Sequence, residues 1–254
     1  MPFTATPEIL VFLFGIALLA GFVDSVAGGG GLISLPTLLA VGIPPHYAIA
    51  TNKLQACFGS FSSTVKFTHA GLVKPHKLWM GIGAVAIGAI LGSLFVQTIS
   101  AKWLSNLIPI FLFIIFGFIL FRKNLGHVDQ HHKLPPYLFY PIFGLTLGFY
   151  DGFLGAGTGT FWVISLITIL GLNFKTATAN SRVMNFSSNF VAMLIFAISG
   201  KIIYTIGIVM AVGQIIGAFI GAHTLIKLNI QLIRIFFLII VGITLVKITW
   251  STYF

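Results

Sequence analysis

Long apolar segments separated by short polar breaks recur along the whole chain. They span residues 9–27, 31–41, 47–67, 78–99 and 103–121 in the first half, and 138–154, 160–170, 174–197, 203–226 and 232–250 in the second. A helix rises about 1.5 Å per residue, so about 20 residues cross the hydrocarbon core of a bilayer. No segment has the pattern of a strand. The pattern therefore predicts an all-α, polytopic membrane protein.

Two of these segments, 31–41 and 160–170, are too short to cross a bilayer as single helices. Each follows a cluster of glycines. We expect broken or re-entrant helices, which are tolerated at membrane depth only where protein or a water-filled cavity satisfies their backbone groups.

The composition agrees with a membrane protein and excludes several other classes. Hydrophobic residues make up 57% of the 254 residues and charged residues only 7%, too few for a soluble surface. The net charge is +10, but the basic residues are thinly spread, so no nucleic-acid partner is expected. A single cysteine excludes an internal disulfide and a cysteine-based zinc site. We expect no cofactor and no metal.

The distribution of basic residues predicts an orientation. Lys66, Lys74 and Lys77 bracket one loop, and the long polar loop 122–136 carries three more basic residues. Two spans separate these loops, so both lie on one side, which the positive-inside rule makes cytoplasmic. If the two short segments cross the membrane, both termini face out. If they do not, both termini face in. The basic residues slightly favour the first arrangement.

The sequence repeats itself. The segment 21–28 returns at 148–155, and 48–53 matches 177–182 after a two-residue insertion. We therefore divide one transmembrane domain, 1–254, into repeat one (about 8–121), the loop 122–136 and repeat two (about 137–250). Five elements per repeat would make the repeats inverted, which we favour, and four would make them parallel. Duplication of this kind, with short helices interrupted by glycine, is typical of secondary transporters.

Glycines and alanines at four-residue spacing form two matched stripes. Ala84, Gly88 and Gly92 correspond to Gly213, Gly217 and Gly221. Such stripes allow close helix packing in membranes, so we assign them to packing and not to binding.

Ionisable residues inside the apolar segments are also matched. Asp24 corresponds to Asp151, and Lys53 corresponds to Arg182. A basic residue at a helix centre costs about 2.5–3.5 kcal/mol on insertion scales, so such residues are usually functional. The alternative is that the two acids neutralise the two bases in buried pairs that only hold the halves together.

The functional interpretation is an anion site between the halves. Lys53 and Arg182 would supply positive charge. Side-chain amides and hydroxyls would supply neutral donors, and glycine-rich loops would expose backbone N–H groups. The proposed donors beside the two bases are Thr51, Asn52, Asn180, Ser181, Asn185, Gly29, Gly30, Gly157 and Gly159. Asp24 and Asp151 are candidates for carrying protons that couple the movement of the anion to a gradient.

The segments 21–31 and 48–54, together with 148–159 and 180–182, resemble the TauE/SafE sulfite exporter family over nearly the whole chain. The resemblance implies a transporter of small sulfur-containing anions, such as sulfite or a sulfonate like sulfoacetate. The second half departs from the first in having Thr158 and Thr160 among its glycines and an arginine at the position of Lys53. This difference leaves open whether both halves contact the anion equally.

We therefore expect a multi-pass protein of the bacterial inner membrane whose partners are the bilayer and a small anionic substrate, and which is not an enzyme. It would work by alternating access around a site near the midplane. The alternatives are an uncoupled anion channel, an integral-membrane enzyme, and a packing or assembly subunit. A homodimer is compatible with the sequence, because lipid-facing and subunit-facing surfaces have the same apolar composition.

Overall fold

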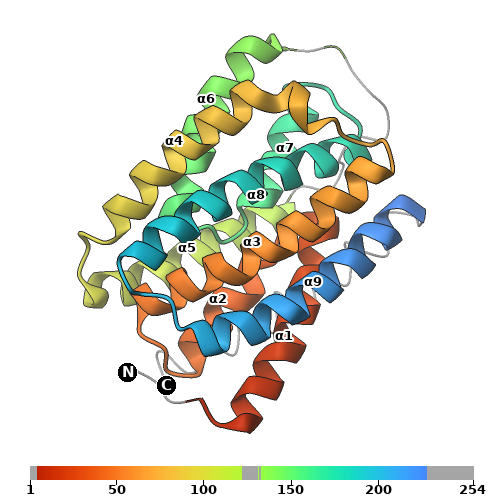
Figure 1. Ribbon diagram of the computed structural model, residues 1–254. Coiled ribbons are helices and arrows are strands. Elements are labelled where there is room, and N and C mark those ends of the chain that lie inside the picture. Colours follow the sequence, from red (N-terminus) through yellow and green to blue (C-terminus); the bar gives the residue numbers. More distant parts are fainter. Residues whose placement is uncertain (1–4, 122–130, 132, 228–254) are drawn as a thin grey trace.

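The computed structural model describes residues 5–121, 131 and 133–227, and these residues form helices without any strand (Figure 1). The helices are α1 (Pro7–Ala27), α2 (Gly31–Ala40), α3 (Pro45–His69), the short 3₁₀ helix η1 (Pro75–Leu78), α4 (Trp79–Val96), α5 (Ala101–Phe121), α6 (Pro136–Phe153), α7 (Thr158–Thr168), α8 (Phe174–Ile198) and α9 (Tyr204–Lys227). Nine predicted segments match α1 to α9 within three residues at each end. The segment 232–250 and most of the loop 122–136 lie outside the described residues.

Local sequence sets several of the helix ends. Proline, which has no N–H to leave unsatisfied, opens α1, α3 and α6. The Asn173 side chain caps α8 by accepting the Thr176 N–H at 3.0 Å. Gly28 closes α1 with φ +84°, a conformation that a residue with a Cβ rarely adopts.

Six of the long helices pack as a row in the order α6, α4, α8, α3, α9, α1. Figure 1 shows α4 and α6 side by side at the upper left, α1 and α9 at the lower right, and α3 and α8 between them. Helix α4 thus packs on two helices of the second half, and α9 packs on two helices of the first. The two halves are interleaved in space.

Small residues let the outer helices of this row approach closely. A Cβ added at Gly88 or Gly92 would meet the backbone of α6, and one added at Gly213, Gly217 or Gly221 would meet the backbone of α1. The assignment of these stripes to helix packing is confirmed.

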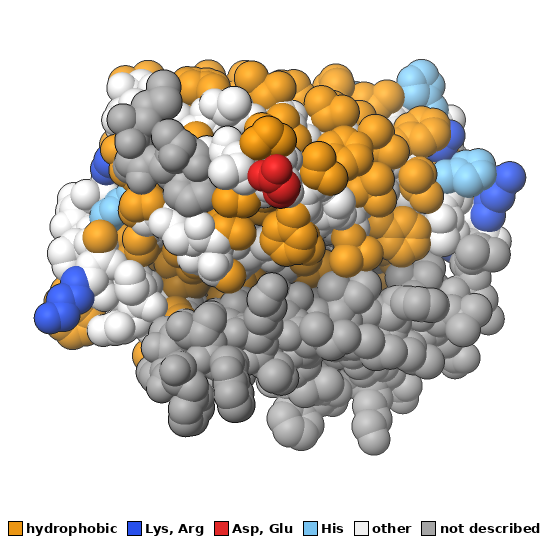
Figure 2. Space-filling model, turned by 90° about the horizontal axis from the view of Figure 1, so that it is seen from below, with side chains coloured by type: hydrophobic (Ala, Val, Ile, Leu, Met, Phe, Trp, Pro, Cys, Tyr) orange, Lys and Arg blue, Asp and Glu red, His pale blue; other side chains and the backbone are white. Residues whose placement is uncertain are grey.

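Many large hydrophobic side chains are exposed on the surface of the described helices. Among the described residues, four helical segments are long and apolar enough to cross a membrane: Pro7–Ala27, Pro75–Val96, Phe174–Ile198 and Tyr204–Lys227. The apolar helices α2 and α7 are shorter. Figure 2 shows hydrophobic side chains over most of the described part of one face, with Lys, Arg and His at its two edges. This distribution fits a protein that is embedded in a bilayer.

Candidate functional site

Two glycine-containing loops meet at the centre of the row. One joins α1 to α2, and the other joins α6 to α7. A Cβ at Gly28 would collide with the backbone of Gly159 and Thr160, and one at Gly31 would press on Ala156. The Thr160 hydroxyl also donates to the Ala27 carbonyl at 2.9 Å. The loops touch because glycine leaves room for backbone against backbone.

The first of two buried ion pairs lies beside the α6–α7 loop. Lys53 of α3 donates from Nζ to Asp151 Oδ1 of α6 at 2.8 Å and to Asn189 Oδ1 of α8 at 3.2 Å. Asp151 also accepts from the Thr158 hydroxyl at 3.1 Å and from the Ser188 hydroxyl. Lys53 is completely buried and the Asp151 side chain is 2% exposed. Both members of this pair are therefore almost completely buried.

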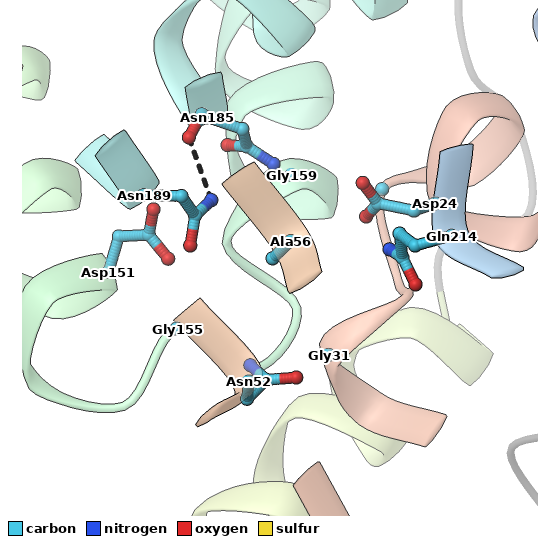
Figure 3. Close-up of a pocket in the computed structure, with 11 residues that line it drawn as sticks. Asp24, Gly31, Asn52, Ala56, Asp151, Gly155, Gly159, Asn185, Asn189 and Gln214 are labelled. Carbon is cyan, nitrogen blue, oxygen red and sulfur yellow. Dashed lines mark hydrogen bonds between the residues drawn. The ribbon is translucent and has the colours of Figure 1, made fainter. Parts of the chain in front are cut away.

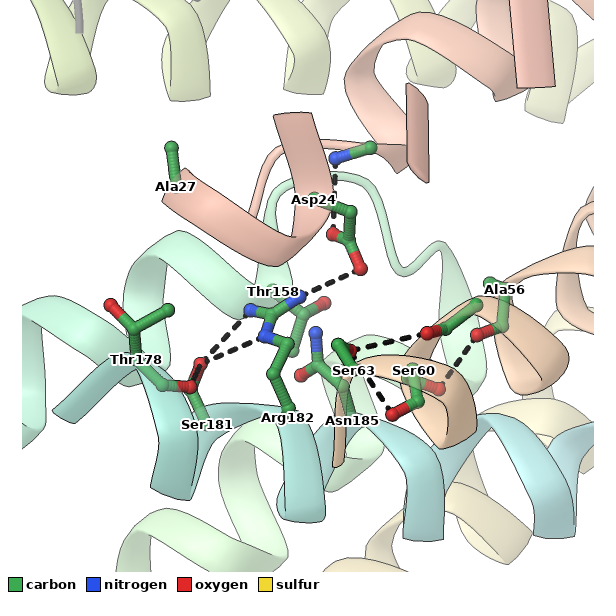
Figure 4. A network of polar contacts seen from close by, with 12 residues as sticks. Asp24, Ala27, Ala56, Ser60, Ser63, Thr158, Thr178, Ser181, Arg182 and Asn185 are labelled. Carbon is green, nitrogen blue, oxygen red and sulfur yellow. Dashed lines mark hydrogen bonds and ion pairs between the residues drawn. The ribbon is translucent and has the colours of Figure 1, made fainter. Parts of the chain in front are cut away.

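The second ion pair lies beside the α1–α2 loop (Figure 4). Arg182 of α8 donates from Nη1 to Asp24 Oδ2 of α1 at 2.7 Å. Its Nε and Nη2 donate to the hydroxyl of the neighbouring Ser181 at 3.2 and 2.9 Å. Asp24 Oδ1 accepts the Gly30 backbone N–H at 3.1 Å. Arg182 is completely buried, whereas the Asp24 side chain is 11% exposed.

Each ion pair joins the first half of the chain to the second. Lys53 of the first half takes an acid from the second, and Arg182 of the second half takes an acid from the first. A single buried charge is very costly, so each partner makes the other tolerable at this depth. The two halves are therefore held together at their centre by charge as well as by packing.

A small polar cavity lies between the two pairs (Figure 3). Its volume is about 20 Å³, which is room for about one water molecule. Its lining consists of carboxylates, carboxamides and small residues: Asp24, Gly28, Gly31, Asn52, Ala56, Asp151, Gly155, Gly159, Asn185, Asn189 and Gln214. Lys53 and Arg182 are not in this lining, although their carboxylate partners are.

Two carboxamide oxygens at this cavity lack a hydrogen-bond partner among the described residues. They are Asn185 Oδ1 on α8 and Gln214 Oε1 on α9. Both side chains are at least 95% buried. Leaving a buried polar atom unpaired costs about 1–3 kcal/mol, and a carboxamide oxygen accepts hydrogen bonds, so these two atoms indicate a place for a hydrogen-bond donor such as water.

The predicted site residues divide into three groups. Asn52, Asn185 and Gly159 line the cavity together with Asp24 and Asp151, and the two bases form ion pairs with these acids. Gly30 and Ser181 hold one ion pair in place, and Gly157, with φ +76°, precedes the first residue of α7. Thr51 accepts the Ile203 N–H, and Asn180 donates to the Thr176 carbonyl of its own helix. The cavity lining does not include Thr51, Asn180 or Gly29.

Sequence reasoning missed three polar residues around the cavity, Gln214, Asn189 and Ser188. Gln214 is an isolated amide within the apolar helix α9, and a polar residue inside a membrane span is itself a signal of function. Asn189 lies one helical turn after Asn185 and shares its face. Among the described residues, no three His, Cys, Asp or Glu side chains gather as a metal site requires.

Comparison with known proteins identifies the family to which this chain belongs. The family model described as sulfite exporter TauE/SafE matches residues 13–248. The chain is 37% identical over 251 residues to the probable membrane transporter protein YfcA of Escherichia coli K12, covering 99% of this chain and 93% of the relative. It is 38% identical over 227 residues to a probable membrane transporter protein of Haemophilus influenzae, covering 89% of each. No solved structure gives a significant match.

Proposed function

Because the chain belongs to the sulfite exporter TauE/SafE family of membrane transporters, we propose that it is a secondary transporter for a small anion. The cargo is a sulfur-containing oxyanion, such as sulfite or a sulfonate. It crosses the bacterial inner membrane by alternating access, with the loop 122–136 on the cytoplasmic side. A membrane enzyme would need a nucleophile or metal cluster, whereas this centre offers matched charges around a small cavity.

The observation that carries this proposal is the pair of fully buried bases, each neutralised by an acid from the other half, on either side of one polar cavity. An oxyanion carries negative charge on oxygens that accept hydrogen bonds, as a carboxylate does, so it can replace Asp24 or Asp151 on its base. Arg182 suits a bidentate contact and Lys53 a point contact. Asn52, Asn185 and the glycines of both loops are the neutral groups that we assign to the same anion.

The order of the helices supports a two-fold relation between the repeats, and we propose that the repeats are inverted. If α1, α3 and α4 correspond to α6, α8 and α9, exchanging the two sets reads the row α6, α4, α8, α3, α9, α1 backwards onto itself. The short helices α2 and α7 follow glycine-containing loops in both halves. Two interleaved units that meet at the ion pairs could rock about this centre, as alternating access requires.

A binding and flux experiment tests the function. We expect sulfite or a small sulfonate to raise the melting temperature of the purified protein in detergent, because a ligand that binds only the folded state stabilises it by mass action. The same anion should enter proteoliposomes, show trans-stimulated exchange and accumulate against its gradient. Sulfate and acetate serve as competing test anions.

The results of this experiment distinguish a secondary transporter from a channel and from an assembly subunit. Flux without trans-stimulation or accumulation would identify a channel. An absence of binding and of flux for every sulfur anion and carboxylate tested would reject the transporter proposal and favour an assembly subunit.

Charge balance leads to a second prediction, which concerns coupling. Both ion pairs are neutral as they stand, so an arriving monoanion adds one negative charge to the buried centre. A proton on the displaced carboxylate offsets it. We therefore expect about one proton to move with each monoanion, reported by a pH-sensitive dye inside proteoliposomes. We expect Asp24→Asn or Asp151→Asn to uncouple the proton, and transport that stays fully pH-dependent in both variants would exclude this role.

A further inference from the structure

The two ion pairs are not equivalent. Asp151 accepts hydrogen bonds from three side chains, those of Lys53, Thr158 and Ser188. Asp24 accepts from one side chain, that of Arg182, and from one backbone N–H. The Asp24 side chain is 11% exposed and the Asp151 side chain 2%. Fewer contacts hold Asp24 in its place.

Two N–H donors lie together beside the Arg182–Asp24 pair. A Cβ at Gly159 would collide with Arg182 Nη2 and Asn185 Nδ2, so both donor groups pack directly against this glycine. Asn185 lies one turn after Arg182 on the same face of α8. In contrast, a Cβ at Gly155 would meet Lys53 Nζ and Asp151 Oδ1, which already satisfy each other.

From this asymmetry, and resting on the proposed function, we propose a division of labour between the pairs. The oxyanion group of the substrate displaces the Asp24 carboxylate from Arg182 and is received by Arg182, the Gly30 N–H and Asn185. The Lys53–Asp151 pair stays closed and holds the two halves in register. Asp24 is thus an internal competitor that occupies the substrate's place when the site is empty.

This assignment follows from the size of the cavity and the geometry of the groups. A cavity of about 20 Å³ holds about one water molecule, so a sulfonate group fits only where another group moves aside. The carboxylate on Arg182 carries one negative charge on oxygens that accept hydrogen bonds, as a sulfonate does, and its other oxygen accepts a backbone N–H that an oxyanion can equally use. Asp24, which borders the cavity and has few contacts, is the group free to move.

The proposal predicts that removing one carboxylate strengthens binding. In Asp24→Asn, Arg182 keeps its position but loses its anionic partner, so an incoming anion no longer breaks a charge-assisted hydrogen bond. We expect the Kd for methanesulfonate and for sulfite, measured by calorimetry on the purified full-length protein, to fall at least about tenfold. In the matched variant Asp151→Asn, we expect no decrease in Kd, because Thr158 and Ser188 keep that position enclosed.

A second pair of variants leaves both ion pairs intact, in case an Asp variant does not fold. Asn185→Ala removes the Nδ2 donor that lies beside Arg182 and should raise the Kd about tenfold. Thr158→Val removes a hydroxyl bound to Asp151 and should lower the melting temperature without weakening binding. If both Asp variants tighten binding equally, or if Asn185→Ala leaves the Kd unchanged, the division of labour is wrong although the transporter proposal stands. If neither anion binds the wild type or any variant, the transporter proposal itself fails.

Discussion

Replacing Arg182 by methionine is expected to lower the free energy of unfolding by about 3–5 kcal/mol, because it leaves the Asp24 carboxylate buried without its counter-charge. Adding Asp24→Asn should recover most of this loss. The asparagine can still accept the Gly30 N–H, and a buried pair replaced by neutral groups of similar volume is often close to neutral in stability. The coupling energy between the two sites should therefore exceed about 2 kcal/mol.

The chain contains its own reporter for this measurement. Cys57 is the single cysteine and is buried, so a dye that fluoresces on reaction with thiols follows unfolding in detergent without labelling elsewhere. The control is Lys102→Met, which removes an exposed basic residue and should change stability by less than about 0.5 kcal/mol. If the double variant is as unstable as Arg182→Met alone, the loss comes from packing around the arginine and not from the unpaired acid.

The helices could be predicted from the sequence because a helix that crosses a bilayer needs about 20 consecutive, mostly apolar residues. Apolar segments between polar breaks marked α1 to α9 closely, and the shortness of α2 and α7 was visible from the length of their apolar segments. The resemblance to the TauE/SafE family is likewise confirmed, since its motifs lie within contiguous stretches of sequence. Both results depend on local patterns, which a single chain displays directly.

The pairing of the charges could not be predicted in the same way. The matched positions of Asp24 and Asp151 indicated a shared role, but which acid meets which base depends on how the halves are interleaved. The acids line the cavity and the bases do not, an arrangement that only the three-dimensional structure reveals. The buried pairs join the halves, as the structural alternative predicts, and binding of an anion at this cavity stays a prediction.

The direction of individual side chains was the least predictable feature. Thr51 and Asn52 are neighbours in α3, but successive residues on a helix point about 100° apart. Asn52 consequently lines the cavity, while Thr51 bonds to the backbone at the start of α9. Gln214 reaches the same cavity from a helix whose sequence neighbours include no other candidate residue, so motif reasoning passed over it.

Substituting alanine for Gly28 is expected to destabilise the protein by about 2–5 kcal/mol. A residue with a Cβ at φ +84° costs about 1–2 kcal/mol, and overpacking against the backbone of Gly159 and Thr160 costs about 1–3 kcal/mol more. Gly42→Ala is the matched control, since φ there is +91° but a Cβ meets no atom within 4 Å. Only the cost of the backbone conformation, about 1–2 kcal/mol, should then appear in the Cys57 assay. Equal losses for both substitutions would mean that the two loops have room to separate, and that their contact adds nothing to the stability of the centre around which the halves are arranged.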